Sequence, residues 1–236
     1  MHQPPSADLH GGPGFRIRRT IERPPQEVTE GFKQFEVAAV SDLMNRLYTM
    51  QRLIRPMVPI VSSLAGPATT VRVFPGDNLM VHAALDIASP GDVVVIDATG
   101  SAMNAALGDM IATKARHRGI SGFVVDGLVR DIVGVEQVGL PVFARGVTPI
   151  GPLHRGPGEV NFPVQCGGVV VCPGDVILAD RDGVVVIPIA YAAKILERCR
   201  MKSASEAGYV AAVKRGDFSN AWVEEALGDG GCEIDR

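Results

Sequence analysis

Asp109, Arg130 and Asp131 are the residues of this chain whose types and spacing are best suited to joint chemistry; residues 110–129 separate the first from the other two. Carboxylate oxygens are the hard ligands that Mg²⁺ and Mn²⁺ prefer. A guanidinium offers a planar fork for a carboxylate or an enolate oxygen. The three residues therefore indicate a site that could hold a divalent metal and an anionic substrate together.

The elements between these residues predict how they meet. Residues 110–118 are typical of a short helix that Gly119 ends, and the apolar run 123–125 is typical of a buried strand that ends at Asp126-Gly127. A helix followed by a buried strand is half of a βαβ unit, whose two ends can meet at one edge of a sheet. We therefore expect the two carboxylates and the guanidinium in one cleft.

Residue types alone leave a structural alternative open for each of these positions. Asp109 could be only a helix N-cap, which stabilises by about 1 kcal/mol. The same helix start would also expose the backbone amides of Met110 and Ile111 as an anion site. Arg130 and Asp131 could be only a surface ion pair of little energetic value.

The rest of the chain predicts one α/β domain with a β-rich centre and helices around it. Two Pro-Gly-Asp turns, at 90–92 and 173–175, each lead into an apolar run that is typical of a strand buried on both faces. Further strands are expected at 142–144, 168–171 and 184–187, and helices at 32–48, at 79–87 and after Pro188. We expect a mobile N-terminal arm over residues 1–27, the domain over 28–215 and a C-terminal tail over 216–236.

Composition narrows the function classes. The net charge of −3 and the pI near 6.0 argue against a nucleic-acid partner, which requires a basic face. The four cysteines form neither a zinc-type pair nor a dense disulfide pattern. No apolar run approaches the roughly 20 residues that span a bilayer, and the first residues lack the order of a signal peptide. The expectation is a cytoplasmic protein with no membrane partner.

Several motifs together resemble the RraA-like superfamily, in particular its class II 4-hydroxy-4-methyl-2-oxoglutarate/4-carboxy-4-hydroxy-2-oxoadipate aldolases, which carry a D-x20-R-D motif. The resemblance covers most of the chain between about residues 28 and 215. The segments that carry it, in chain order, are 65–71, 77–79, 90–93, Gly108-Asp109, Asp126-Gly127, Arg130-Asp131 and 167–184.

The resemblance implies an αββα sandwich of the swivelling-domain type, assembled as a homotrimer or hexamer with its active site at a subunit boundary. It implies that Asp131 binds Mg²⁺ or Mn²⁺ directly and that Asp109 holds the metal through water. Arg130 would contact the substrate and, with Asp109, be catalytic. Gly108 and the amides of Met110 and Ile111 would receive the carboxylate of the pyruvyl group.

The implied activity is retro-aldol cleavage of a 4-hydroxy-2-oxo acid to pyruvate, with decarboxylation of oxaloacetate as a second activity. The family also uses a carboxylate from a neighbouring subunit, for which Glu206 is the first candidate here and Glu197 the second. A non-enzymatic regulator that inhibits a ribonuclease by contact is the alternative, and the presence of Asp109, Arg130 and Asp131 together favours the enzyme.

Other chemically capable residues have simpler interpretations. Lys114 lies near an expected helix end, where cations are favourable, so a Schiff base is not expected. His82, His117 and His154 lack ligand spacing, and Cys166 has no evident base. Arg145 follows an expected strand and could reach the cleft from it.

Overall fold

The protein, for which a computed structural model describes residues 8–233, is built on a mixed β-sheet. The strands are β1 (Phe15–Ile17), β2 (Arg55–Pro56), β3 (Leu64–Val73), β4 (Val93–Asp97), β5 (Ala105–Leu107), β6 (Gly122–Val129), β7 (Val142–Val147), β8 (Gly158–Val160), β9 (Val164–Cys166), β10 (Val169–Val171), β11 (Val176–Asp180) and β12 (Gly183–Ile187). The helices are α1 (Gln26–Gly31), α2 (Val37–Leu43), α3 (Leu79–Leu85), α4 (Asp109–His117), α5 (Ile132–Val138), α6 (Ala192–Lys214) and α7 (Ala221–Asp229), with 3-10 turns at Phe32–Gln34 and Ile189–Tyr191.

Four parallel strands form the centre of the sheet, in the order β3-β4-β6-β7. Every residue of β4 is buried, as the continuous apolar run predicts for a strand covered on both faces. The preceding Pro-Gly-Asp turn depends on Gly91, whose φ of 92° lies in the left-handed region that glycine adopts without strain. The equivalent turn before β11 uses Gly174 at a φ of 89°.

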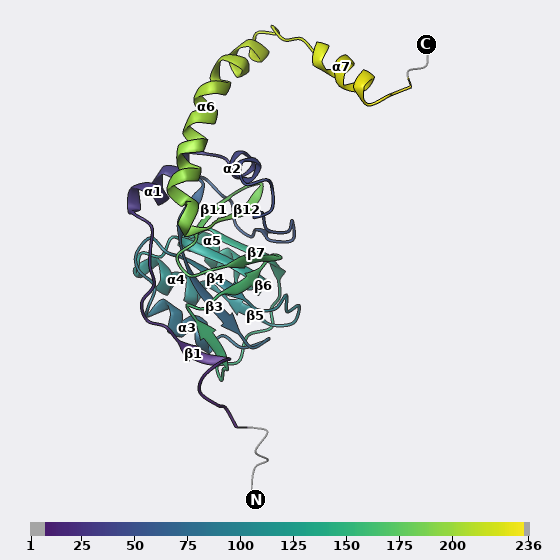
Figure 1. Cartoon of the computed structure of the whole chain (residues 1–236). Coiled ribbons are helices and arrows are strands. Elements are labelled where there is room, and N and C mark those ends of the chain that lie inside the picture. The colour runs from purple at the N-terminus through teal and green to yellow at the C-terminus, as the bar shows by residue number, and fades with distance from the viewer. Residues whose placement is uncertain (1–7, 234–236) are drawn as a thin grey trace, which may run out of the picture. The chain divides into compact units, whose positions relative to one another are not determined.

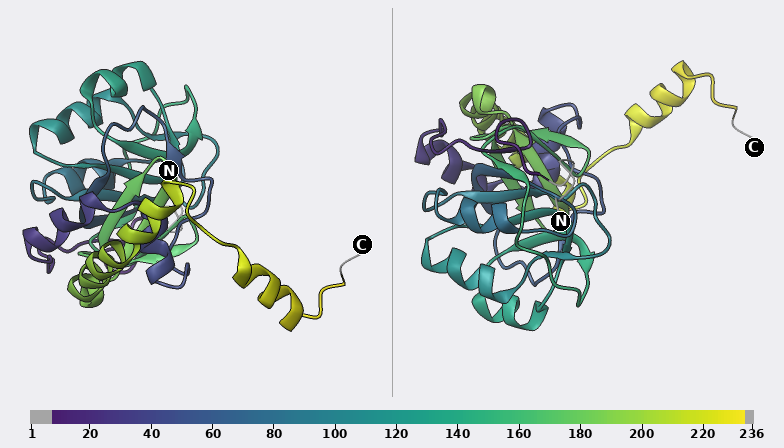
Figure 2. Two further views of the ribbon diagram at one scale, coloured as in Figure 1. Left: turned by 90° about the horizontal axis from the view of Figure 1, so that it is seen from above. Right: turned by 90° about the horizontal axis from the view of Figure 1, so that it is seen from below.

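Helices and strands form the expected αββα layers. Helices α3, α4 and α5 cover one face of the central sheet, where one apolar cluster is buried. Strands β9–β12 cover the other face and enclose a second cluster, and α2 packs against β11 and β12. Figure 1 and the two views of Figure 2 show the teal helices and the green strands on opposite sides of the sheet. The α/β fold expected from the sequence is confirmed.

The chain divides into two compact units, the first ending at Glu197 and the second beginning at Arg198. The first contains the whole sheet. The second contains most of α6 and all of α7, and it exposes the side chains of Tyr209, Phe218 and Trp222. No helix among residues 8–233 is both long and apolar enough to cross a membrane.

The expected N-terminal arm begins outside the described residues, and its described part makes specific contacts. Strand β1 pairs in parallel with β8, and Arg23 donates two hydrogen bonds to Asp92 in the core. The expected tail contains α7, and its last three residues, 234–236, lie outside the described part.

The single helix expected over 32–48 is wrong. Phe35 and Glu36 are extended, which interrupts the helix. The amide of Val37, the first residue of α2, donates to the carboxylate of Asp180 at 2.9 Å, so a side chain distant in sequence stabilises a new helix start there. After α2, Asn45 and Arg46 adopt left-handed conformations, with φ values of 57° and 65°. The strand end predicted at Asp126-Gly127 is also wrong, because β6 continues through these residues to Val129, with a register shift against β7.

Candidate active site

Asp109, Arg130 and Asp131 line one pocket of about 240 Å³. Asp109 opens α4, with only Gly108 between it and β5. Arg130 follows the last residue of β6, and Asp131 precedes α5. The pocket therefore lies at the carboxyl end of a central parallel strand, where open α/β sheets bind ligands. Its lining is Asn78, His82, Leu107–Ile111, Lys114, Arg130, Asp131, Gly151, Pro152 and His154.

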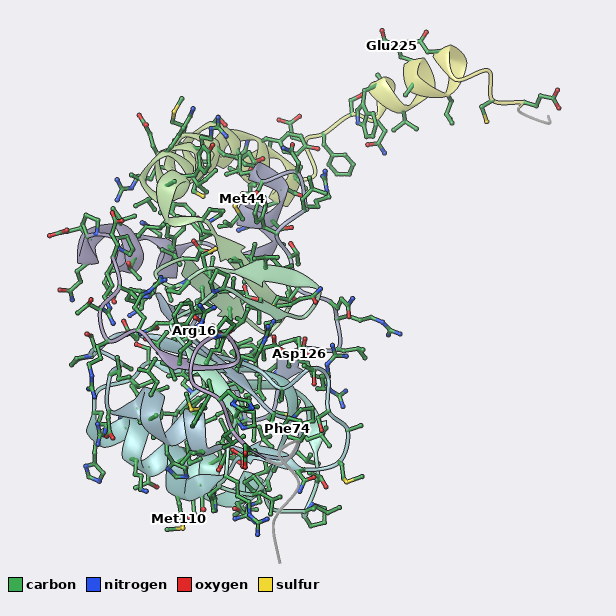
Figure 3. All side chains as sticks on the ribbon, turned by 60° about the horizontal axis from the view of Figure 1, so that its bottom comes forward. Arg16, Met44, Phe74, Met110, Asp126 and Glu225 are labelled. Carbon is green, nitrogen blue, oxygen red and sulfur yellow. The ribbon has the colours of Figure 1, made fainter. Side chains whose placement is uncertain are left out.

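The start of α4 presents backbone amides to this pocket. Gly108 is the N-cap residue, and the amide of Ala112 makes the first helical bond, to the Gly108 carbonyl at 3.1 Å. The amides of Met110 and Ile111 therefore have no carbonyl to bond within the helix. Gly108, not Asp109, occupies the N-cap position, and Asp109 is the first helical residue, so the N-cap interpretation of Asp109 is wrong. The side chain of Met110 is exposed on the helical layer (Figure 3).

The Arg130–Asp131 pair is held in an unusual backbone conformation. The Arg130 amide donates to the Leu107 carbonyl at 3.0 Å, which ties the end of β6 to β5. Asp131 has a φ of 56° and a ψ of 42°, in the left-handed region that aspartate tolerates better than most residues. Its carboxylate lies 3.2 Å from Arg130 Nε, and both side chains remain partly exposed. The pair is thus fixed by its backbone but open to a ligand.

Three glycines make room for the three charged side chains. A methyl group on Gly108 would collide with Asp131 Oδ2. One on Gly134, in α5, would lie 2.7 Å from Asp109 Oδ2, and one on Gly151 would lie 2.6 Å from Arg130 Nη1. Each functional side chain therefore occupies the space that a Cβ would fill.

Gly108→Ala is expected to lower turnover about a hundredfold, because the new methyl displaces the Asp131 carboxylate and misplacement of about 1 Å can have that effect. The melting temperature should stay near that of the wild type, since the φ of −143° at Gly108 is open to alanine and only a side chain must move. Gly208→Ala, which has no atom within 4 Å of its new methyl, is the matched control for steady-state kinetics. If Gly108→Ala had wild-type activity, Asp131 would not be part of the active site.

The donor set fits a hard divalent cation. Among residues 8–233 no group of three or more His, Cys, Asp or Glu side chains is placed to hold a metal. Asp131 and Asp109 offer carboxylate oxygens in one pocket, and Mg²⁺ is commonly bound by one or two carboxylates while it keeps several waters. The pocket thus suits Mg²⁺ or Mn²⁺ better than a zinc ion, which prefers four nitrogen or sulfur ligands.

Two histidines that the sequence did not connect lie on the pocket wall. The rings of His82 and His154 meet edge to face, with centroids 5.6 Å apart. His154 Nδ1 lies 2.6 Å from Oδ1 of the buried Asn78, whose amide nitrogen donates to the Ala106 carbonyl. No spacing signal could have linked residues this far apart. His154 lies in the loop between β7 and β8, and the backbone bonds of Leu153 with Gly76 and Asn78 bring this loop beside the start of α3.

The pKa of His82 is lowered from the usual 6.5, first by desolvation and then by the positive charges of Lys114 and His154, with Asp86 opposing. As the pH falls below about 6.5 the unfolded chain takes up this proton before the folded protein does, so stability is lost. We expect the melting temperature to fall less between pH 7.5 and 5.5 in His82→Gln than in the wild type. An equal fall in both proteins would contradict the shift.

The remaining residues considered from the sequence fall in different places. Lys114 lies on the pocket wall, whereas Arg145 lines another cavity. Cys166 is buried, and that burial raises the pKa of its thiol well above the usual value, which does not suit a nucleophile. Glu206 is an exposed residue of α6 in the second unit, with Lys202 Nζ 3.8 Å from its carboxylate.

A larger hollow, of about 610 Å³, lies at the opposite ends of the strands. It is bordered by Leu64 at the start of β3 and by Ser121 and Pro141, which precede β6 and β7. Its charged lining residues are Lys33, Arg116 and Glu136. Volume alone would select this hollow, but the paired carboxylates lie in the smaller pocket.

A family model and a named relative agree on the family. The model described as "RraA-like: Aldolase/RraA" matches residues 37–186. A protein of Halalkalibacterium halodurans named "Putative 4-hydroxy-4-methyl-2-oxoglutarate aldolase" is 41% identical over 175 residues, which are 74% of this chain and 83% of that protein.

Two solved structures have the same fold. An uncharacterized protein from Pseudomonas syringae pv. tomato superposes with a TM-score of 0.74 at 27% identity, over 84% of this chain and 97% of that one. Streptomyces coelicolor RraAS2, described as an unusual member of the RNase ES inhibitor RraA protein family, gives a TM-score of 0.73 at 30% identity, over 80% of this chain and 98% of that one. The residues that the family model matches, 37–186, include every residue that lines the pocket of Asp109.

Proposed function

Since this chain belongs to the RraA-like family, we propose that it is a divalent-metal-dependent lyase that cleaves a 4-hydroxy-2-oxo acid and releases pyruvate. The observation that carries the proposal is the meeting of Asp109, Arg130 and Asp131 in one pocket at the start of α4. The names of the aldolase relatives support the reaction class. 4-Hydroxy-4-methyl-2-oxoglutarate and 4-carboxy-4-hydroxy-2-oxoadipate are the candidate substrates.

Binding follows from the charges in the pocket. The amides of Met110 and Ile111 receive the substrate's carboxylate at the positive end of α4, beside Gly108, whose missing side chain leaves the approach open. The Arg130 guanidinium donates to the neighbouring keto oxygen. These contacts orient the carbon–carbon bond between C3 and C4 of the substrate for cleavage.

Cleavage requires the loss of one proton and the acceptance of one electron pair. Asp109 accepts the proton of the 4-hydroxyl through water. The 4-oxygen then forms the carbonyl of the departing product as the C3–C4 bond breaks, and the electrons of that bond become those of a pyruvate enolate. Arg130 stabilises the growing negative charge on the enolate oxygen. A cation held by Asp131, with Asp109 beside it, would add positive charge at the same oxygen. Protonation of the enolate carbon gives pyruvate.

Oxaloacetate is the second substrate that this chemistry favours. Its carboxylate and keto oxygen match those of the aldol substrate, and loss of CO₂ places the same electron pair in the same enolate. Arg130 therefore stabilises both reactions by one contact. The decarboxylase activity needs no proton acceptor for a hydroxyl, so it should depend on Asp109 less than the aldolase activity does.

We further propose that the site is completed by a neighbouring subunit of a homotrimer or hexamer. The pocket has two carboxylates of its own, and Glu206 on α6 is the candidate for a third from the partner. Glu206→Gln should then raise the metal concentration required for half-maximal activity, and light scattering should report a trimer or hexamer. Glu197→Gln, on the same helix, is the comparison that decides between the two glutamates.

Protein binding in place of catalysis is the second candidate, since RraAS2 is described as a member of a ribonuclease-inhibitor family. The charged pocket argues against it, because a contact inhibitor needs neither the carboxylates nor the glycines that make room for them. An RNase ES activity assay with the purified protein tests this candidate directly.

The deciding experiment measures pyruvate release from 4-hydroxy-4-methyl-2-oxoglutarate and from oxaloacetate, first with Mg²⁺ or Mn²⁺ and then with EDTA. Release from both that EDTA abolishes is the expected result. Pyruvate release from oxaloacetate alone would support the enolate chemistry but show that the aldol substrate is a different oxo acid. Release that persists in EDTA would refute metal dependence, and no release from either would favour the protein-binding candidate.

A further inference from the structure

A row of four charged residues crosses the central sheet on the face away from α3–α5. Arg72, Asp97 and Asp126 are register partners on β3, β4 and β6, and Arg145 on β7 follows Ala144, the partner of Val125. Two residues earlier on the same face, β4, β6 and β7 carry Val95, Val124 and Phe143, which are buried in the second cluster, and β3 carries the buried Thr70. We call the four charged residues the Arg–Asp row.

The two inner carboxylates use their oxygens within the protein. Asp97 accepts hydrogen bonds from the amides of Thr99 and Gln165 and from Arg72 Nε at 3.1 Å. Asp126, in β6, accepts one from the amide of Gly167 at 2.7 Å and one from Arg145 Nε. Both carboxylates are buried, so they anchor the β9–β10 hairpin and the two guanidiniums but are not free to bind a cation.

The two outer guanidiniums keep most of their donors. Each donates through Nε only, and within residues 8–233 their terminal Nη groups form no hydrogen bond. Both residues line a cavity of about 300 Å³, whose other lining residues are Gln51, Asp97, Thr99, Gly100, Asp126, Gln165 and Gly168. A guanidinium fixed through Nε and open at Nη is set to bind an oxyanion in the bidentate manner.

The cavity is lined by two guanidiniums and two carboxylates, but the carboxylates are less available to a ligand than the guanidiniums. The negative charge of the two carboxylates is already solvated by three backbone amides, on Thr99, Gln165 and Gly167. The hydrogen bond from Arg145 to Asp126 raises the pKa of the guanidinium, which keeps its positive charge at every accessible pH. The free donors at the cavity wall are therefore cationic.

We propose that the Arg–Asp row forms a second ligand site, which binds a small oxyanion, a carboxylate or a phosphate, on the Nη groups of Arg72 and Arg145. The site is separate from the pocket of Asp109, because the two share no lining residue. In Figure 3, Asp126 of the row and Met110 of that pocket lie well apart. The proposal does not depend on the lyase activity.

The test is isothermal titration of the full-length protein with potassium phosphate and, separately, potassium succinate, at constant ionic strength. Saturable binding by the wild type is expected. The anion that binds more strongly shows whether the natural ligand carries a phosphate or a carboxylate. Arg72→Lys and Arg145→Lys should each weaken binding about tenfold or more, since lysine keeps the charge beside the aspartate but loses the fork. Arg46→Lys, on an exposed ion pair elsewhere, should leave binding unchanged.

Arg130→Lys separates the two sites. If anion binding is lost in this variant but kept in Arg72→Lys and Arg145→Lys, the anion occupies the pocket of Asp109 and the proposal is overturned. The absence of binding to the wild type at tens of millimolar would also overturn it and leave the Arg–Asp row a structural network. Circular dichroism verifies folding, and the more exposed Arg72 keeps the test valid if Arg145→Lys unfolds.

Discussion

Asp131→Asn is expected to lower the turnover of both 2-oxo acids by about a hundredfold or more, the scale on which a lost electrostatic contact to developing charge acts. Asparagine keeps the size of the side chain and tolerates the left-handed backbone found at this position, so the change removes charge alone. Steady-state pyruvate release over a series of Mg²⁺ concentrations is the measurement. We expect the metal requirement to rise together with the loss of turnover.

Glu136→Gln is the matched control for this variant. Glu136 is an exposed carboxylate on α5, the helix that Asp131 precedes, but it borders the larger hollow instead of the site. Its loss should change neither turnover nor metal requirement. Equal activity in Asp131→Asn and Glu136→Gln would show that Asp131 is not a metal ligand.

Asp92→Ala is expected to lower the free energy of unfolding by about 3–5 kcal/mol, the scale for removing one partner of a buried ion pair. The carboxylate of Asp92 is 1% exposed. It accepts two hydrogen bonds from Arg23, at 2.9 and 2.7 Å, and one each from the Thr69 hydroxyl and the Ser89 amide. Its removal leaves these donors without an acceptor, so the melting temperature should fall by about 10 °C.

Arg23→Ala distinguishes the origin of this effect. Arg23 is partly exposed, and without it Asp92 still accepts bonds from Thr69 and Ser89, so the loss of stability should be clearly smaller. Urea unfolding of the two variants measures the difference. An equal loss of stability in both variants would show that Asp92 stabilises the fold only through its pair with Arg23, and that its bonds with Thr69 and Ser89 contribute nothing.

Features that depend on local pattern could be predicted from the sequence. Continuous apolar runs after Pro-Gly-Asp turns identified β4 and β11, since a strand buried on both faces needs no polar alternation. The spacing from Asp109 to Asp131 placed both carboxylates and Arg130 in one cleft, because α4 and β6 return the chain to the same sheet edge. The αββα fold followed from the family resemblance and is confirmed.

Features that depend on contacts between distant segments could be seen only in the tertiary structure. Asp180 starts α2 afresh and so breaks the helix expected over 32–48, because its carboxylate satisfies an amide that periodicity cannot anticipate. His82 and His154 meet only because the loop before β8 bonds to the backbone just before α3, and the Arg–Asp row exists only in the register of four strands. Helical period and turn chemistry act over a few residues, whereas register and layer packing are set by the whole core.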